Sequence, residues 1–215
     1  AVDLLPQAAT AKYLAQVASA AQRAKELVSQ ILTFSRQGSP ERKTLRLSPL
    51  IKESLKLLRA SLPSTITIQQ DLRARDDRIL TDPTQIHQVL MNLCTNAAYA
   101  MRGKGGTLAV SLDEVPIPEG RSQTYTGLEP GSYLRLTVAD TGHGMDPATV
   151  ERIFDPFFTT KPVGEGTGLG LSVVHGIVKS HGGEIKVKSE LGRGTVFEIF
   201  LPRANQADDA YPTSK

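Results

Sequence analysis

Glycine residues are concentrated in one part of the chain, and their spacing there suits the binding of an anion. Of the 18 glycines, eleven fall between Gly142 and Gly194. In residues 164–171 (GEGTGLGL) glycine alternates with other residues just before a helical pattern. Amides at a helix N-terminus lack partners within the helix, and together with the helix dipole they favour phosphate. The segment is not a P-loop, because no G-x-x-x-x-G-K-[ST] pattern occurs, and it is not a Rossmann turn, because its glycines do not directly follow a strand.

A carboxylate stands at the end of an expected strand. Asp140 directly follows an apolar run that ends at Ala139, and Gly142 and Gly144 come next. A carboxylate in this position can accept a hydrogen bond from an exocyclic amine such as that of adenine. The glycines would let a ligand approach the backbone. An ordinary turn with no role in binding is the alternative interpretation of the same residues.

Two asparagines are spaced four residues apart within an expected helix. Asn92 and Asn96 therefore lie one above the other, at the border of the apolar stripe of that helix. Amide oxygens are suitable ligands for a hard cation that keeps several waters and is shared with phosphates. Asparagine is a poor residue for a helix interior, so two at this spacing argue against a merely solvated pair.

The pattern around these residues predicts the elements that position them. Ser48 followed by Pro49, and Asp82 followed by Pro83, are typical of helix starts. Hairpin-like links join some of the strands and helices join others, so we expect a mixed sheet with three helices on one face, which is a two-layer α+β sandwich. The expected helices are residues 48–59, 82–102 and 168–180, and the expected strands are residues 65–72, 107–115, 132–139, 184–189 and 195–201.

The first 38 residues predict a separate helical region. From Leu14 onward apolar residues recur at alternating spacings of three and four, and the pattern stops at Gly38. Residues 1–9 resemble the end of an earlier helix broken at Pro6. We expect the long helix to pack on another chain or on a partner helix outside this sequence; packing on its own domain is the alternative. Residues 204–215 are polar and are expected to form a linker or tail.

Composition excludes several classes of protein. Apolar residues make up 40% and charged residues 22%, so the chain is expected to be globular. The net charge is only +3 and no long basic run occurs, which argues against a nucleic-acid partner. No apolar stretch has the length of a membrane span. The single Cys94 fits a reducing compartment, so we expect a cytoplasmic location, with membrane anchoring of a longer parent protein left open.

Five segments stand in the order of the N, G1, F, G2 and G3 boxes of sensor histidine kinases and resemble them. The resemblance covers residues 45–203, and residues 20–37 are also similar to the second helix of that family's dimerisation and phosphotransfer hairpin. It implies the Bergerat ATP-binding sandwich, a fold shared with the Hsp90, gyrase and mismatch-repair ATPases. The five segments are residues 92–97, 140–145, 154–161, 166–171 and 192–195.

The resemblance implies a magnesium–ATP site. Asn96 would be the Mg²⁺ ligand, with Asn92 beside it. Asp140 would hold the adenine amino group, and Thr195 would lie near the base. The other implied positions are Gly142, Gly144 and Met145 around the base, Thr160 and Lys161 toward the phosphates, and Gly166, Thr167, Gly168, Leu169, Gly170 and Leu171 cradling the phosphates.

The segment between Met145 and Gly166 resembles the mobile lid of that family. Phe154, Phe157 and Phe158 would anchor it. A glycine-rich loop with phenylalanines at intervals suits a cover that closes on a ligand. An ordinary surface loop pinned by three aromatic residues is the alternative.

None of the four histidines fits the family's phosphoacceptor, which is followed by an acidic residue. Gln follows His87, and Gly follows His143, His175 and His181. We expect His87 to lie on the surface. The acceptor normally stands on the preceding helix, so the chain is expected to start just past it and to phosphorylate a histidine only in trans.

The expected function is therefore a Mg-ATP-binding histidine kinase domain that serves a response regulator. Its expected partners are ATP, a second copy through the N-terminal helix in the full-length protein, and a receiver domain. One alternative is an ATP hydrolase of the Hsp90 or mismatch-repair group, although that group places a glutamate base where Asn92 stands here. Another is an ATP-gated dimerisation module without kinase activity. A serine kinase of the anti-sigma type shares the fold but lacks a helix like residues 20–37.

Overall fold

The computed structural model describes residues 42–119 and 127–204. The long N-terminal helix expected from the sequence lies outside these residues, as does the expected tail apart from Ala204, which is buried. The helices are α2 (Leu47–Ser61), α3 (Pro83–Ala100), α4 (Pro147–Arg152) and α5 (Gly170–Ser180). The strands are β1 (Lys43–Arg46), β2 (Ile66–Leu72), β3 (Arg78–Thr81), β4 (Gly106–Ile117), β5 (Gly131–Asp140), β6 (Glu184–Glu190) and β7 (Gly194–Pro202). No helix in the described part is long and apolar enough to cross a bilayer.

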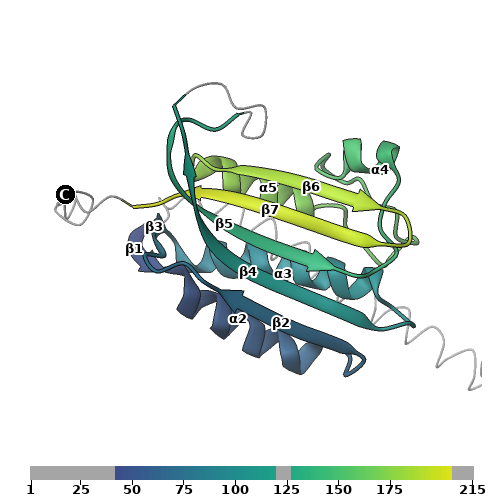
Figure 1. The fold of residues 1–215 in the computed structure, drawn as a ribbon. Helices are drawn as coiled ribbons and strands as arrows, with labels where there is room; N and C mark the ends of the chain where they lie inside the picture. The colour runs from purple at the N-terminus through teal and green to yellow at the C-terminus, as the bar shows by residue number, and fades with distance from the viewer. Residues whose placement is uncertain (1–41, 120–126, 205–215) are drawn as a thin grey trace, which may run out of the picture.

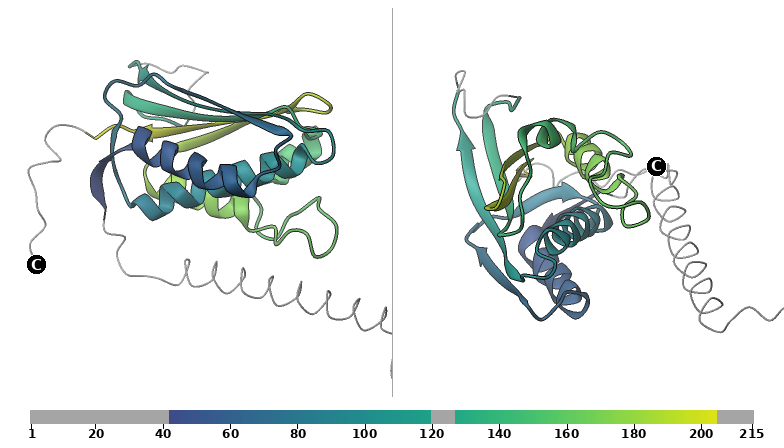
Figure 2. Two further views of the ribbon diagram at one scale, coloured as in Figure 1. Left: turned by 90° about the horizontal axis from the view of Figure 1, so that it is seen from below. Right: turned by 90° about the vertical axis from the view of Figure 1, so that its right-hand side faces the viewer.

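Five strands form a mixed sheet in the order β2-β4-β5-β7-β6 (Figure 1). Strands β2 and β4 pair in parallel, and the other neighbours pair antiparallel. A separate antiparallel pair, β1 and β3, lies at one end of the helices. Figure 2 shows α2, α3 and α5 together on one face of the sheet. The expected mixed sheet of an α+β domain is confirmed for the described residues.

The core lies between α3 and the middle of the sheet. Leu90 and Leu93 of α3 and Leu108 and Leu136 of the central strands are each at most 1% exposed. Alternate residues of β4 and β5 point toward the helices, as the period of two along a strand requires. Burying each such side chain contributes roughly 1.5–3 kcal/mol. The core therefore fixes α3 against the strands whose ends carry the candidate site.

Helix α3 begins where the sequence predicts. The backbone N–H of Thr84 donates to Asp82 Oδ1 over 2.8 Å, and Pro83 occupies the first turn. The helix has an apolar face toward the sheet, which leaves Asn92 and Asn96 at its edge. Asp82 is thus confirmed as the N-cap.

Helix α2 begins one residue before the predicted cap, so the assignment of Ser48 as N-cap is wrong. The carboxylate of Asp77, in a distant loop, caps the helix instead. The Ser48 N–H donates to Asp77 Oδ2 over 2.8 Å, and Arg46 Nε donates to Asp77 Oδ1 over 2.7 Å. Leu47 N–H donates to the backbone oxygen of Asp77. Burial alone would raise the pKa of Asp77, but the bonds from Ser48 and Arg46 outweigh it and hold the pKa below its usual value.

Replacing Asp77 by alanine will lower the free energy of unfolding by about 2 kcal/mol, because the Ser48 N–H and the Arg46 guanidinium lose their acceptor. The control variant Asp71→Ala, which removes an exposed carboxylate paired with the exposed Arg73, will change it by less than about 0.5 kcal/mol. Urea denaturation measures both, and equal losses would contradict the capping assignment. Because the folded pKa is depressed, the contribution of Asp77 is complete above the unfolded value near 3.8 and is lost as the pH falls below it.

Three short elements were not predicted, namely β1, β3 and α4. Each has four to six residues, which is too short for a period to be recognised. The expectation that His87 is a surface residue is met only in part, because its side chain is 28% exposed. Its Nδ1 lies 2.6 Å from Oγ of the buried Ser54, so His87 joins α3 to α2.

Candidate functional site

A pocket of about 290 Å³ opens beside α3, between the turn after β5, the 145–169 segment and the first turn of α5. Thirteen of the fifteen predicted site residues line it; Gly142 and Leu169 do not. The thirteen are Asn92, Asn96, Asp140, Gly144, Met145, Thr160, Lys161, Gly166, Thr167, Gly168, Gly170, Leu171 and Thr195.

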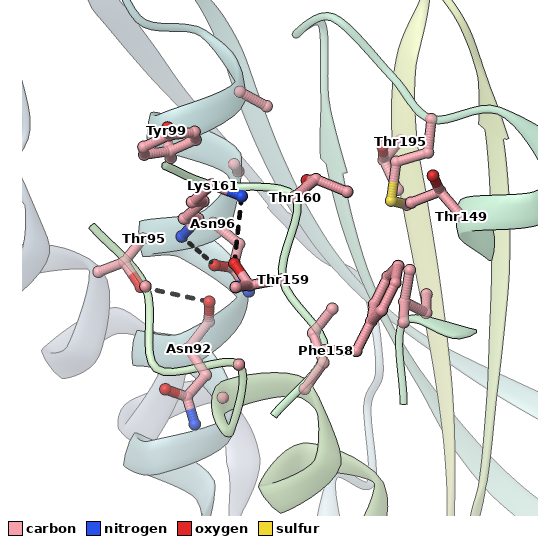
Figure 3. A pocket seen from close by; sticks show the side chains of 18 of the residues that line it. Asn92, Thr95, Asn96, Tyr99, Thr149, Phe158, Thr159, Thr160, Lys161 and Thr195 are labelled. Atoms are coloured by element: carbon pink, nitrogen blue, oxygen red, sulfur yellow. Dashed lines mark hydrogen bonds between the residues drawn. The ribbon is translucent and has the colours of Figure 1, made fainter. Parts of the chain in front are cut away.

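One end of the pocket joins α3 to the 145–169 segment through a lysine. Lys161 Nζ donates to Asn96 Oδ1 over 2.9 Å and lies 4.4 Å from the ring centre of Tyr99 (Figure 3). Burial lowers the pKa of Lys161, and the nearby Arg102 lowers it further. The Asn96 amide oxygen therefore already faces a cation in this structure.

The start of α5 lies against the other asparagine. A Cβ added to Gly170 would be 3.4 Å from Asn92 Oδ1, which is ordinary van der Waals contact, so the first turn of α5 lies directly against Asn92. No side chain caps α5, and its first turn carries no acidic residue. The helix N-terminus therefore presents its dipole and first-turn amides to the pocket, where Gly170 and Leu171 are lining residues.

Asp140 lies at the opposite end of the pocket and is 8% exposed. The N–H of Gly142 donates to Asp140 Oδ1 over 2.8 Å. Burial raises the pKa of Asp140, although the amides of Gly142 and Thr195 partly offset that rise. Figure 3 shows Thr195, the register partner of Asp140, across the pocket from Asn96 and Lys161.

The glycines beside Asp140 make room for other parts of the chain. A Cβ on Gly142 would be 2.6 Å from Ala100 Cβ, and a Cβ on Gly144 would be 2.0 Å from the backbone oxygen of Glu190. The expectation that Gly142 opens space for a base is therefore not met: that space is occupied by α3. These glycines instead let the turn after β5 pack between α3 and the β6–β7 hairpin.

Two of the three expected lid anchors are packed as predicted, and one is not. Phe154 and Phe158 pack on the core, with the Phe154 ring centre 5.3 Å from that of His175. Phe157 is 71% exposed and has a φ of 67°, so an anchoring role for it is wrong in this structure. Its backbone instead contacts Gly168, where an added Cβ would be 2.3 Å from the carbonyl carbon of Phe157.

Three residues that hold the 145–169 segment against α3 were not predicted from the sequence. Arg102 Nη1 donates to Glu165 Oε2 over 2.5 Å, and Tyr99 OH lies 3.2 Å from the same oxygen. Tyr99 lies three residues after Asn96, so helical spacing alone would have placed it on the pocket side. No local signal connects Glu165 to Arg102, because the two are 63 residues apart in the chain.

The mixed sheet, the helices on one face and this pocket define an α+β domain that binds its ligand between a helix and a glycine-rich segment. The chain belongs to the family of histidine kinase-, DNA gyrase B- and HSP90-like ATPases, whose model matches residues 81–205. Within that family it is the ATP-binding catalytic domain of a sensor histidine kinase of a two-component system, as the relatives below indicate.

Two curated relatives cover most of this chain. Sensor kinase CckA of Brucella abortus is 39% identical over 198 residues, which are 91% of this chain and 21% of that protein. Sensor histidine kinase ZraS of Salmonella typhimurium is 40% identical over 192 residues, which are 88% of this chain and 37% of that protein. The chain therefore spans well under half the length of these relatives.

Solved structures agree with the fold. The catalytic domain of histidine kinase ThkA has a TM-score of 0.61 at 32% identity, covering 76% of this chain and 96% of that one. ThkA in complex with the response regulator TrrA has a TM-score of 0.70 at 26% identity, covering 94% of this chain and 54% of that one. Full-length ShkA in complex with AMPPNP has a TM-score of 0.66 at 25% identity, covering 95% of this chain and 40% of that one.

Proposed function

We propose that this chain binds Mg-ATP in the pocket and transfers the γ-phosphoryl group to a histidine supplied in trans, for relay to a response regulator. The observation that carries the proposal is the convergence of thirteen predicted residues, from segments far apart in the sequence, on one pocket. The pocket has a buried carboxylate at one end and a lysine with a helix N-terminus at the other.

The residues present fit a magnesium ion. Asn96 Oδ1 accepts from the Lys161 ammonium group, so this amide oxygen already faces a positive charge, as it would if it held Mg²⁺. Among the described residues no group of three or more His, Cys, Asp and Glu could hold a metal. A site whose protein ligand is an amide oxygen suits Mg²⁺, which keeps several of its waters and is shared with phosphates. When bound, the ion would neutralise charge on the transferred phosphoryl group.

The two ends of the pocket would orient the nucleotide. The Asp140 carboxylate would accept from the adenine amino group, with Gly144, Met145 and Thr195 around the base. Gly142 would contribute through its N–H, which holds the Asp140 carboxylate in place. At the other end Lys161 and Thr160 would face the phosphates, with Asn92 beside the metal ligand. The amides of residues 166–171, Leu169 included, would cradle the phosphates at the start of α5.

The positions and partners of the carboxylates that line the pocket favour phosphoryl transfer over hydrolysis of ATP. Of the described residues, Asp140 and Glu165 are the acidic ones that line it. Asp140 is paired in register with Thr195, which lies across the pocket from Lys161 (Figure 3), and Glu165 is paired with Arg102. The Glu165 carboxylate is already engaged by Arg102 and Tyr99, and Asn92 cannot act as a general base for a water. Phosphoryl transfer chiefly needs positioning and charge neutralisation, which this pocket supplies.

All four histidines already make contacts within the fold, which supports an acceptor outside this chain. His87 Nδ1 contacts Ser54, and His143 Nδ1 lies 2.7 Å from the backbone oxygen of Gly144. The ring of His175 lies against Phe154. His181 Nε2 lies 2.8 Å from Thr81 Oγ1, and burial lowers the pKa of His181.

The proposed domain organisation follows the sequence. Residues 45–203 would form the catalytic domain, residues 1–38 part of the dimerisation and phosphotransfer region, and residues 204–215 a linker or tail. The N-terminal helix would join two copies in the full-length protein. The complex of ThkA with its response regulator supports a receiver domain as the other partner.

The proposal is tested by incubating the chain with Mg²⁺ and γ-labelled ATP. The chain alone will acquire no acid-labile label, whereas addition of a separate dimerisation hairpin that carries its acceptor histidine will give a labelled hairpin. Strong acid-labile labelling of this chain alone would overturn transfer in trans. Absence of any binding of Mg-ADP, measured by calorimetry, would overturn the nucleotide site itself.

A further inference from the structure

Ser189, on β6, lies at a junction of three polar groups at the Asp140 end of the pocket. Its Oγ is 2.8 Å from the backbone nitrogen of Met145, 3.1 Å from the backbone oxygen of Gly194 and 2.9 Å from Thr195 Oγ1. Ser189 itself does not line the pocket, whereas Met145 and Thr195 do. The serine therefore acts on the pocket through its neighbours.

Counting hydrogens fixes the direction of these bonds. The Met145 N–H can only donate and the Gly194 carbonyl can only accept, while Ser189 has a single hydroxyl hydrogen. All three contacts become hydrogen bonds only if Ser189 accepts from Met145, donates to Gly194 and accepts from Thr195. The Thr195 hydroxyl hydrogen then points at Ser189. In the opposite arrangement Ser189 would donate to Thr195 and lose its bond to Gly194.

This direction decides what Thr195 offers to a ligand. With its hydrogen committed to Ser189, the hydroxyl presents only lone pairs to the pocket. Thr195 is 5% exposed and is paired in register with Asp140, whose carboxylate is also an acceptor. Two buried acceptors side by side favour a ligand edge that carries an exocyclic amino group, because the two acceptors can share its two hydrogens. A carbonyl oxygen at that edge would remain unpaired, which is costly in a buried site.

We propose that Ser189 is a positioning residue that holds Thr195 as a hydrogen-bond acceptor and thereby makes the base site select a 6-amino purine over a 6-oxo purine. The inference rests on the proposed function, because it assumes that the base lies at this end of the pocket. Without the Ser189 hydroxyl, the Thr195 hydrogen is free to turn into the pocket and donate to a carbonyl.

The test compares the affinities of Mg-ADP and Mg-IDP, which differ only in the purine base, by calorimetry. In Ser189→Ala the preference for ADP over IDP will fall about tenfold, as expected for one hydrogen bond reversed in a buried site. Ser189→Thr, which keeps a hydroxyl, will restore the preference. The matched control Ser180→Ala will leave it unchanged, because Ser180 Oγ donates to the Ile177 carbonyl at the far end of α5.

A double-mutant cycle separates this role from simple support of Met145. In a Thr195→Val background the hydroxyl is gone, so adding Ser189→Ala will not change the ADP-to-IDP ratio further. Equal weakening of ADP and IDP in Ser189→Ala, measured on protein shown to be folded by urea denaturation, would overturn the inference. If the unaltered chain binds neither nucleotide, the proposed function itself fails.

Discussion

Asparagine in place of Asp140 will lower the affinity of the domain for Mg-ADP about 100-fold. The amide oxygen can still accept from Gly142 N–H, so the turn keeps its shape. The amide NH₂ then takes the place of the second carboxylate oxygen, and a donor meets the amino group of the base. Both the lost charged hydrogen bond and the unpaired donors weaken binding. Isothermal titration calorimetry measures the change.

The matched control is Asp82→Asn at the start of α3. Asparagine is as good an N-cap as aspartate, and Asp82 lies outside the pocket, so affinity will stay within about twofold of the unaltered chain. Burial raises the pKa of Asp140, so its proton returns at higher pH than in an exposed aspartate. Affinity for Mg-ADP will therefore fall as the pH is lowered toward that raised pKa. Unchanged affinity in Asp140→Asn would contradict the base assignment.

Alanine in place of Gly144 will destabilise the domain by about 3 kcal/mol or more. Gly144 has a φ of 67°, which disfavours any residue with a Cβ, and the added Cβ would be 2.0 Å from the Glu190 carbonyl oxygen. Relief of that clash requires the turn after β5 to move away from the β6–β7 hairpin. Because this turn carries Asp140 and Met145, affinity for Mg-ADP will fall at least tenfold.

Gly192 provides the comparison that isolates the clash. It has a similar φ of 78° and lies in the same β6–β7 hairpin, but an added Cβ would meet no atom within 4 Å. Gly192→Ala will therefore cost only the backbone term, about 1 kcal/mol, and its N–H will still donate to the His143 carbonyl. Urea denaturation of the two variants measures the difference. Equal losses of unfolding free energy in the two variants would mean that the clash of the added Cβ at Gly144 with Glu190 does not reduce stability.

Much of the fold is readable from the sequence because it depends on local patterns. The apolar stripe of α3 and its Asp82–Pro83 start predict a helix that the structure contains at residues 83–100. Alternation along β4 and β5 likewise predicts strands with one face against the helices. The prediction fails where an element is too short to show a period, as in β1, β3 and α4, and where a distant residue replaces a local one, as Asp77 replaces Ser48.

The candidate site could also be predicted in part, where it depends on spacing within a single segment. Asn92 and Asn96 share a helix face, and the glycines from 164 to 170 lead into the first turn of α5, so the spacing within each segment indicates a shared role. The reason for the glycine at 142 was misjudged, because the atoms near its missing Cβ belong to α3 and not to a ligand. Nothing local indicates that Ser189 contacts Met145.

The sequence by itself determined the class of the protein, the order of its elements and the residue types gathered at the pocket, because these depend on spacing within single segments. Only the tertiary structure decided which segments meet: Lys161 with Asn96, Glu165 with Arg102, and Ser189 with Thr195. The first two pairs join residues more than sixty positions apart, which no periodicity records. The third pair joins neighbouring strands, where the direction of a hydrogen bond depends on every polar group around it.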